Sequence, residues 1–80
     1  MSVTVLLFAS YAEALGTSRV HMDISEGETV TSLLDRLRGR AGAQALPPQP
    51  LVAINEQYAG AARVLQPGDT VAVIPPVAGG

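Results

Sequence analysis

Apolar and polar positions along the chain predict four to five strands, one main helix and one short helix. Residues 3–8 are apolar and rich in β-branched side chains, which is typical of a buried strand. Residues 19–24 alternate between polar and apolar side chains, which predicts a strand with one face in water. Further strands are expected at residues 51–54, at residues 70–74 and, as a short segment, at Tyr58.

The main helix is predicted where apolar residues recur at helical spacing. Four of them occupy the i, i+3, i+4 and i+7 positions of one helical face: Val30, Leu33, Leu34 and Leu37. Thr29 precedes this run and is expected to cap the helix. A short helix is expected to open at Ser10, since Ser10 and Glu13 have the spacing of a capping box. Gly16 follows it, in the place of a left-handed C-cap.

Proline and glycine predict the turns between these elements. Gln66 to Asp69 reads Gln-Pro-Gly-Asp, with Pro and Gly in positions that suit a tight turn before the last strand. Residues 41–50 hold three prolines and predict a loop. Pro75 and Pro76 end the last strand because neither can donate a ladder hydrogen bond. The chain therefore divides into a folded domain, residues 1–76, and a flexible tail, residues 77–80.

This order of elements predicts an α+β fold. One amphipathic helix can cover one face of a mixed sheet, which gives a roll. The first and last strands are the most apolar, so we expect them side by side at the sheet centre with both faces buried. Phe8 and the helix leucines are expected in the core, and Tyr58 in either the core or an interface.

Composition narrows the function. The chain has 80 residues, enough for one domain but not for a deep substrate pocket. It is 48% hydrophobic and 15% charged, so its surface is apolar enough to suggest a protein partner. It lacks a basic run, which argues against nucleic-acid binding. The longest apolar run, Val5 to Ala9, is too short to cross a bilayer, and no secretory signal is visible. We therefore expect a cytoplasmic protein.

Cysteine and histidine usage excludes several kinds of site. The sequence contains no cysteine, so thiolate metal sites and disulfides are excluded. Its single histidine, His21, cannot build a metal site alone and is expected to be solvated. Asp35, Arg36 and Arg38 are expected on a solvated helix face. Any sulfur that the protein carries must sit elsewhere than on a thiol side chain.

The most distinctive stretch is the tail. Pro75-Pro76 holds the chain extended as it leaves the last strand. Gly79-Gly80 follows and carries no side chains. A carboxylate presented in this way can pass down a narrow channel into another protein's active site, where a side chain would clash.

Four segments resemble the small subunit of molybdopterin synthase, a ubiquitin-like sulfur carrier. They are Phe8-Ala9, Val52-Ala53-Ile54-Asn55, Pro67-Gly68-Asp69 and, the most specific, Ile74-Pro75-Pro76-Val77-Ala78-Gly79-Gly80. The resemblance spans the whole chain. It departs from the family in the short helix, where Ala12 precedes Glu13 and the family often has an Arg-Glu pair.

The resemblance implies a β-grasp fold and a carrier without an active site of its own. A ubiquitin-activating-like adenylyltransferase would use ATP to adenylate the Gly80 carboxylate, and a sulfur donor would convert it to a thiocarboxylate. The tail (Pro75, Pro76, Val77, Ala78 and Gly79) would enter the large synthase subunit, where sulfur passes to the cyclic pyranopterin precursor. The resemblance implies no bound cofactor and no metal.

Two other readings stay open. A sulfur carrier for thiamine or tRNA thiolation would have the same fold and tail, although Pro75-Pro76 favours the molybdopterin pathway. The other reading belongs to a different class, a ubiquitin-like modifier that forms isopeptide bonds, or a plain β-grasp binding module.

Overall fold

The computed structural model describes residues 1–40, 46–47 and 50–75 of the chain. Its elements are, in order, β1 (Ser2–Leu7), α1 (Ala9–Leu15), β2 (Arg19–Asp23), α2 (Val30–Leu37), β3 (Leu51–Ile54), β4 (Gln57–Tyr58) and β5 (Thr70–Ile74). The predicted strands and both predicted helices are present. Most of the loop expected at residues 41–50 lies outside the described residues.

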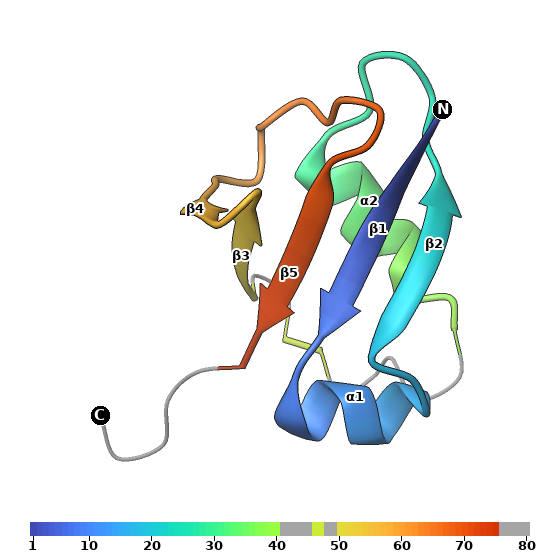
Figure 1. Cartoon of the computed structure of the whole chain (residues 1–80), viewed down its shortest axis with the longest axis vertical. Helices are drawn as coiled ribbons and strands as arrows, with labels where there is room; N and C mark the ends of the chain where they lie inside the picture. The colour runs from blue at the N-terminus through green and yellow to red at the C-terminus, as the bar shows by residue number, and fades with distance from the viewer. Residues whose placement is uncertain (41–45, 48–49, 76–80) are drawn as a thin grey trace.

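The strands form one mixed sheet in the order β2-β1-β5-β3-β4 (Figure 1). The two apolar strands β1 and β5 lie side by side and parallel, with Thr4 beside Thr70 and Leu7 beside Val73. β2 pairs antiparallel with β1, and β3 pairs antiparallel with β5. A helix packed across a mixed sheet whose first and last strands are central neighbours is the β-grasp arrangement expected above.

The core fills the space between the sheet and α2. The four apolar residues of the predicted helix face are all buried, which confirms the periodicity. They meet the alternate side chains of β1, β3 and β5 that point to the same side. The largest fully buried side chains are Leu33, Leu37, Ile54, Val3, Val5, Val30, Val71 and Val73.

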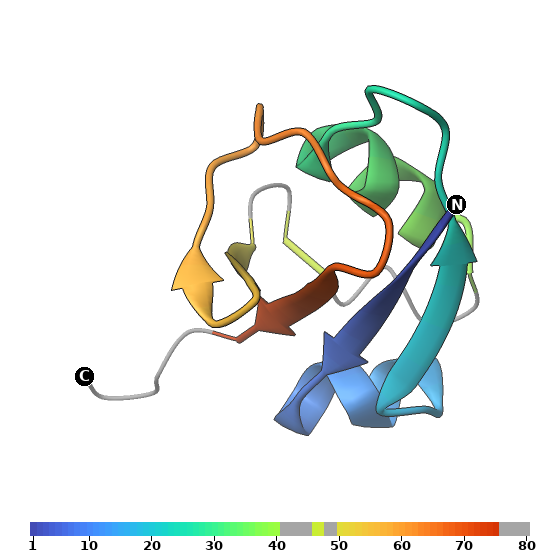
Figure 2. The same cartoon turned by 45° about the horizontal axis from the view of Figure 1, so that its top comes forward.

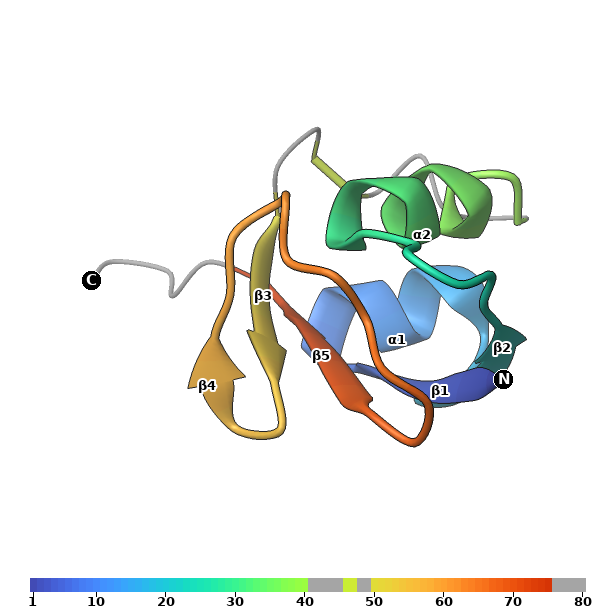
Figure 3. The same cartoon turned by 90° about the horizontal axis from the view of Figure 1, so that it is seen from above.

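Both helices lie on one side of the sheet (Figure 3). The expectation that both faces of the central strands are buried is therefore wrong. Along β1 and β5, buried residues alternate with partly exposed ones. Successive side chains of a strand point to opposite faces, so one-sided helix packing leaves Leu6, Ala72 and Ile74 uncovered by any helix.

Two of the three predicted helix signals are confirmed. The Thr29 hydroxyl oxygen accepts a hydrogen bond from the Ser32 backbone N–H at 3.2 Å, which caps α2. Gly16 has a φ of 76°, and its N–H donates to the Ala12 carbonyl at 2.9 Å, which ends α1. Glycine adopts this left-handed conformation without a Cβ penalty.

The third signal, the capping box at Ser10, is wrong. The N-cap of α1 is Phe8, whose carbonyl accepts from the Tyr11 N–H at 3.0 Å, and no side chain caps this end. The chain turns into the helix directly after β1, through Ala9 at a φ of 48°. The earlier start leaves Ser10 inside the helix and lets Tyr11 pack in the core.

The connection between β4 and β5 runs past the beginning of α2 (Figure 2). Its Arg63 carbonyl accepts from the Val30 N–H at 3.0 Å, and its Leu65 is buried in the core. The connection ends in the predicted turn at Gln66–Asp69. Gly68 has a φ of 83°, and the Asp69 N–H donates to the Gln66 carbonyl at 3.1 Å. The turn prediction is confirmed.

Candidate functional site

The predicted site begins where β5 ends. Of the predicted site residues, Pro75 alone lies within the described part of the chain. It follows β5 directly and is partly buried. Pro76, Val77, Ala78, Gly79 and Gly80 lie outside the described residues, as does the boundary placed between residues 76 and 77.

The strand that leads to Pro75 is held on both sides. β5 pairs with β1 from Thr70 to Val73 and with β3 from Val71 to Ile74. Val71 and Val73 are fully buried beneath it. A strand with two neighbours and an anchored inner face holds its end in a fixed position, so the sheet fixes the point from which the tail leaves.

The other end of β5 is braced by two residues from the motifs noted in the sequence. One Asp69 carboxylate oxygen accepts from the Asn55 side-chain amide at 2.9 Å, and the other accepts from the Gln66 N–H at 2.8 Å. The Asn55 side-chain oxygen in turn accepts from the Thr70 N–H at 3.0 Å. Asp69 is buried, so these bonds offset the cost of burying its charge. These motif residues have a structural role.

The uncovered face of the sheet carries a shallow hollow of about 460 Å³. It is lined by residues of β1, of the N-cap of α1, of β5 and of the β3–β4 turn: Leu6, Phe8, Asn55, Glu56, Thr70 and Ala72. Further apolar side chains flank it. Ile74 lies beside Leu51 at the end of β5, and Tyr58 is 75% exposed on β4. We call the apolar residues Leu6, Phe8, Leu51, Tyr58, Ala72 and Ile74 the outer patch.

The placement of Phe8 in the core is wrong. Phe8 is 45% exposed and lies one residue beyond β1. Period-two alternation could have found it, because Val3, Val5 and Leu7 point inward and residues 6 and 8 must then point outward. The same alternation holds on β3. Val52 and Ile54 are buried beneath the sheet, and Leu51 faces out.

A larger groove of about 710 Å³ lies on the other side of the sheet, between α2 and β3. Leu34, Val52 and Ala59 form part of its apolar lining. Pro75 does not line it, and Leu51 is the one residue that it shares with the outer patch. Because it does not include the residue from which the tail leaves, we assign it no part in the site.

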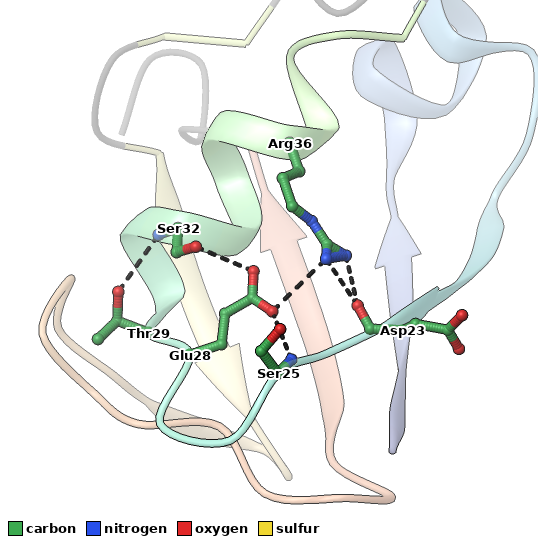
Figure 4. Close-up of polar contacts among 6 residues, drawn as sticks. All are labelled: Asp23, Ser25, Glu28, Thr29, Ser32 and Arg36. Carbon is green, nitrogen blue, oxygen red and sulfur yellow. Dashed lines mark hydrogen bonds and ion pairs between the residues drawn. The ribbon is translucent and has the colours of Figure 1, made fainter.

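A second polar network joins β2 to α2 through Glu28 (Figure 4). Glu28 is only 7% exposed. Its carboxylate accepts from the Ser25 backbone N–H at 3.0 Å and from the Ser32 hydroxyl at 2.9 Å, and it lies 3.5 Å from the Arg36 guanidinium. The Arg36 guanidinium also donates to the Asp23 carbonyl. Arg36 is exposed, as expected of a solvated helix face, and it also has these partners within the fold.

Hydrogen bonding to the charged form lowers the pKa of Glu28. The bond from the Ser25 N–H has the largest effect, and the Ser32 hydroxyl and the Arg36 charge add to it, while burial opposes them. Each oxygen of this carboxylate already has a donor within the fold. Glu28 thus holds the start of α2 in place, which is a structural role.

The remaining candidates have ordinary surroundings. His21 is exposed, and its Nδ1 lies 3.3 Å from the Thr4 hydroxyl. Asp35 is exposed on α2 and pairs at 3.4 Å with Arg38, the partly buried C-cap of the helix, which also donates to the Pro47 carbonyl. Within the described ranges, no three His, Asp or Glu side chains gather as a metal site would require. No helix in that part of the chain is long and apolar enough to span a bilayer.

Comparison with protein-family models matches residues 5–80 to the ThiS family. The chain belongs to the ThiS family. The molybdopterin synthase sulfur carrier subunit of Drosophila simulans is 37% identical over 83 aligned residues, which cover all of this chain and 92% of that protein. The relationship to molybdopterin synthase small subunits predicted from the sequence is confirmed.

Solved structures confirm the β-grasp fold of this ThiS-family chain. SAMP1 from Haloferax volcanii matches all of both chains with a TM-score of 0.86 and 31% identity. A complex of subunits 1 and 2 of the molybdopterin-converting factor from Helicobacter pylori contains a chain that matches over the full length of both, with a TM-score of 0.74. That match is 21% identical and shows the shared fold alone.

Proposed function

We propose that this chain carries sulfur for molybdopterin synthase as a thiocarboxylate on Gly80. The observation that carries the proposal is the full-length similarity, at 37% identity, to a protein named as the sulfur carrier subunit of that synthase. The sequence contains no cysteine, so no side chain could carry the sulfur as a persulfide, and this fits a carrier that uses its C-terminal carboxyl group. The proposed compartment is the cytoplasm.

The Gly80 carboxylate is a poor acyl donor, so the proposed chemistry begins with its activation. One oxygen of the Gly80 carboxylate attacks the α-phosphate of ATP on a ubiquitin-activating-like adenylyltransferase, and pyrophosphate leaves. The terminal sulfur of a donor persulfide then attacks the acyl carbon of this mixed anhydride and AMP leaves. A thiol then reduces the resulting acyl disulfide, which yields the thiocarboxylate and leaves the donor sulfur in a disulfide. Sulfur next passes to the cyclic pyranopterin precursor. The chain supplies the reacting carboxyl group, and the catalytic groups belong to its partners.

The outer patch is the proposed docking surface for the large synthase subunit. Ordering a tail of about five residues costs on the order of 5–10 kcal/mol of backbone entropy, and glycines make few contacts to offset it. The folded body must therefore supply binding energy. The outer patch adjoins the end of β5 and exposes Phe8 and Leu51 to solvent, at 45% and 46%. Aromatic side chains such as Phe8 and Tyr58 are enriched at protein interfaces.

A second candidate function is protein modification. The similarity to SAMP1 from Haloferax volcanii favours it. A second matching structure from that organism is named small archaeal modifier protein 1. As a modifier, the chain would form an amide bond between the Gly80 carbonyl and a lysine of a target. Both functions begin with the same adenylate and differ in the group that attacks it, sulfur in the first and an amine in the second.

Reconstitution of the synthase reaction tests the proposal. The thiocarboxylated chain, the large subunit and the precursor should yield molybdopterin. A chain that lacks Gly79 and Gly80 should yield none, while its thermal unfolding midpoint should stay nearly unchanged, because neither glycine adds to the core. Product formation by the shortened chain would contradict the proposal. A large loss of thermal stability would show that the tail is part of the packed fold.

A further inference from the structure

The turn between β3 and β4 has an unfavourable backbone conformation at a charged residue. Asn55 and Glu56 form this two-residue turn and have φ angles of 51° and 72°. Positive φ at both positions is characteristic of the type I′ hairpin turn, whose second position favours glycine. Asparagine tolerates the left-handed region, but a side chain such as that of glutamate is disfavoured there.

Elsewhere the chain mostly uses glycine for this conformation. Glycine has positive φ at three other places, Gly16, Gly27 and Gly68. In the turn before α2, Glu26 precedes Gly27, and the glycine takes the positive φ. Apart from Asn55 and Glu56, Ala9 is the one other non-glycine residue with positive φ among the described residues. Glu56 is thus a charged residue at a position where glycine would be less strained.

The fold gives no return for this cost at the Glu56 side chain. Within the described part of the chain, no hydrogen bond or ion pair reaches its carboxylate. The turn is held by its neighbour, because the Asn55 N–H donates to the Thr70 carbonyl at 2.9 Å and the Asn55 side-chain oxygen accepts from the Thr70 N–H at 3.0 Å. Asn55 therefore ties the turn to β5 and fixes the place of Glu56.

That place is the rim of the hollow on the outer face. Among the described residues that line the hollow, Glu56 alone is charged, and Leu6, Phe8 and Ala72 are apolar. Glu56 is exposed in the free chain. A partner that covers the hollow would remove water from its carboxylate, and a desolvated carboxylate is strongly unfavourable without a counterion. A partner of this face therefore needs a cation beside Glu56.

We propose that Glu56 is the anionic anchor of the outer patch and pairs with an arginine or lysine of the large synthase subunit. The inference rests on the proposed docking and deepens it, because it names the chemistry of the partner's surface. Apolar contacts are not directional, whereas one ion pair at a fixed place beside them selects an orientation of docking. Glu56 is a positioning residue and takes no part in the chemistry at Gly80.

Two substitutions separate the charge from the backbone cost. Glu56→Gln removes the charge and keeps the strained conformation, so the thermal unfolding midpoint should stay unchanged while Kd for the large subunit rises about 10-fold at low salt. Glu56→Gly removes both. Its midpoint should rise by a few degrees, because relief of the strain outweighs the freedom that glycine gives the unfolded chain, and its Kd should rise as in Glu56→Gln.

Glu26→Gln is the matched control. Glu26 is also an exposed glutamate in a turn, and its loss changes the net charge by the same amount, but it lies between β2 and α2 and does not line the hollow. Its Kd should stay within about 2-fold of that of the unaltered chain. Titration calorimetry at about 0.05 M and about 0.5 M salt should show the effect of Glu56→Gln shrinking as salt screens the pair.

Three results would overturn the inference and leave the proposed function standing. They are equal affinity of Glu56→Gln and the unaltered chain at low salt, full affinity of Glu56→Gly, and a loss in Glu26→Gln as large as that in Glu56→Gln. The last would show an effect of net charge alone. Failure of the unaltered chain to bind the large subunit would contradict the proposed function, and this inference with it.

Discussion

The two faces of the sheet are built from the same strands and have different surroundings. On the inner face, Val5, Val71 and Val73 are fully buried against α2. On the outer face, the neighbouring residues Leu6, Ala72 and Ile74 are partly exposed, and no helix covers them. Both faces carry apolar side chains. The difference lies in what covers them, so apolar character alone does not tell whether a strand position serves stability or recognition.

The contrast assigns different roles to the two faces. Side chains on the inner face contribute to the free energy of folding, since their burial is complete without a partner. Side chains of the outer patch keep much of their apolar area in water, and they gain most when a partner covers it. Mutations on the inner face should therefore lower the free energy of unfolding, whereas mutations in the outer patch should weaken binding to the partner.

The largest effect is expected on the inner face. Replacing Leu33 by Ala removes buried methyl groups and leaves a cavity between α2 and the sheet, which should lower the free energy of unfolding by about 2–5 kcal/mol. Leu51→Ala is the matched control on the outer face and should cost less than about 1 kcal/mol. Urea denaturation measures both. Equal losses would contradict the distinction between the faces.

The next effect concerns binding. Phe8→Asp should weaken association with the large synthase subunit by about 2 kcal/mol, or ~30-fold in Kd, because it puts a charge into an apolar interface. The fold should be retained. Phe8 is the N-cap of α1 and its backbone is extended there, a position that favours aspartate. Titration calorimetry measures the loss, and unfolding curves check stability.

Val64→Asp is the control for this variant. Val64 is also an exposed apolar residue, but it lies in the β4–β5 connection beside Thr29, away from the outer patch. The Val64→Asp variant should bind the large subunit with the affinity of the unaltered chain. Unchanged affinity in Phe8→Asp would remove the outer patch from the proposed interface.

A smaller effect is expected from the Glu28 network. The pKa of Glu28 is lowered in the folded chain, so its charged form adds stability that is present above the unfolded pKa, near 4.5. That stability is lost as pH falls through the lower, folded pKa. Glu28→Gln should cost about 1 kcal/mol near neutral pH and little in acid. Unfolding free energies measured from pH 7 down to pH 2 should therefore converge, and parallel curves would contradict this role.

Much of the fold followed from local patterns in the sequence. The spacing of Val30, Leu33, Leu34 and Leu37 placed α2, and Gly16 and Gly68 marked a helix end and a turn. Each of these signals depends on backbone conformation or periodicity within a few residues. The tail motif was likewise readable, because it consists of adjacent residues at the end of the chain.

Features that depend on distant residues were missed. The spacing of Ser10 and Glu13 suited a capping box, but the packing of Tyr11 and the turn at Ala9 moved the start of α1. The burial of Asp69 could not be read from the sequence, since its donor Asn55 comes from another segment. The donors to Glu28 are local, because Ser25 and Ser32 lie three and four residues away, but neither spacing was recognised as a signal. The exposure of Phe8 was missed for another reason, because the period-two alternation along β1 would have predicted it.

The most direct test of the account is the mass of the chain after activation. The chain is incubated with ATP, its activating enzyme and a sulfur source, and its intact mass and C-terminal fragment are measured. We predict one oxygen replaced by one sulfur, located at Gly80. Sulfur at any other position, or stable amide adducts with lysines of other proteins as the sole products, would contradict the proposal that this chain is a sulfur carrier.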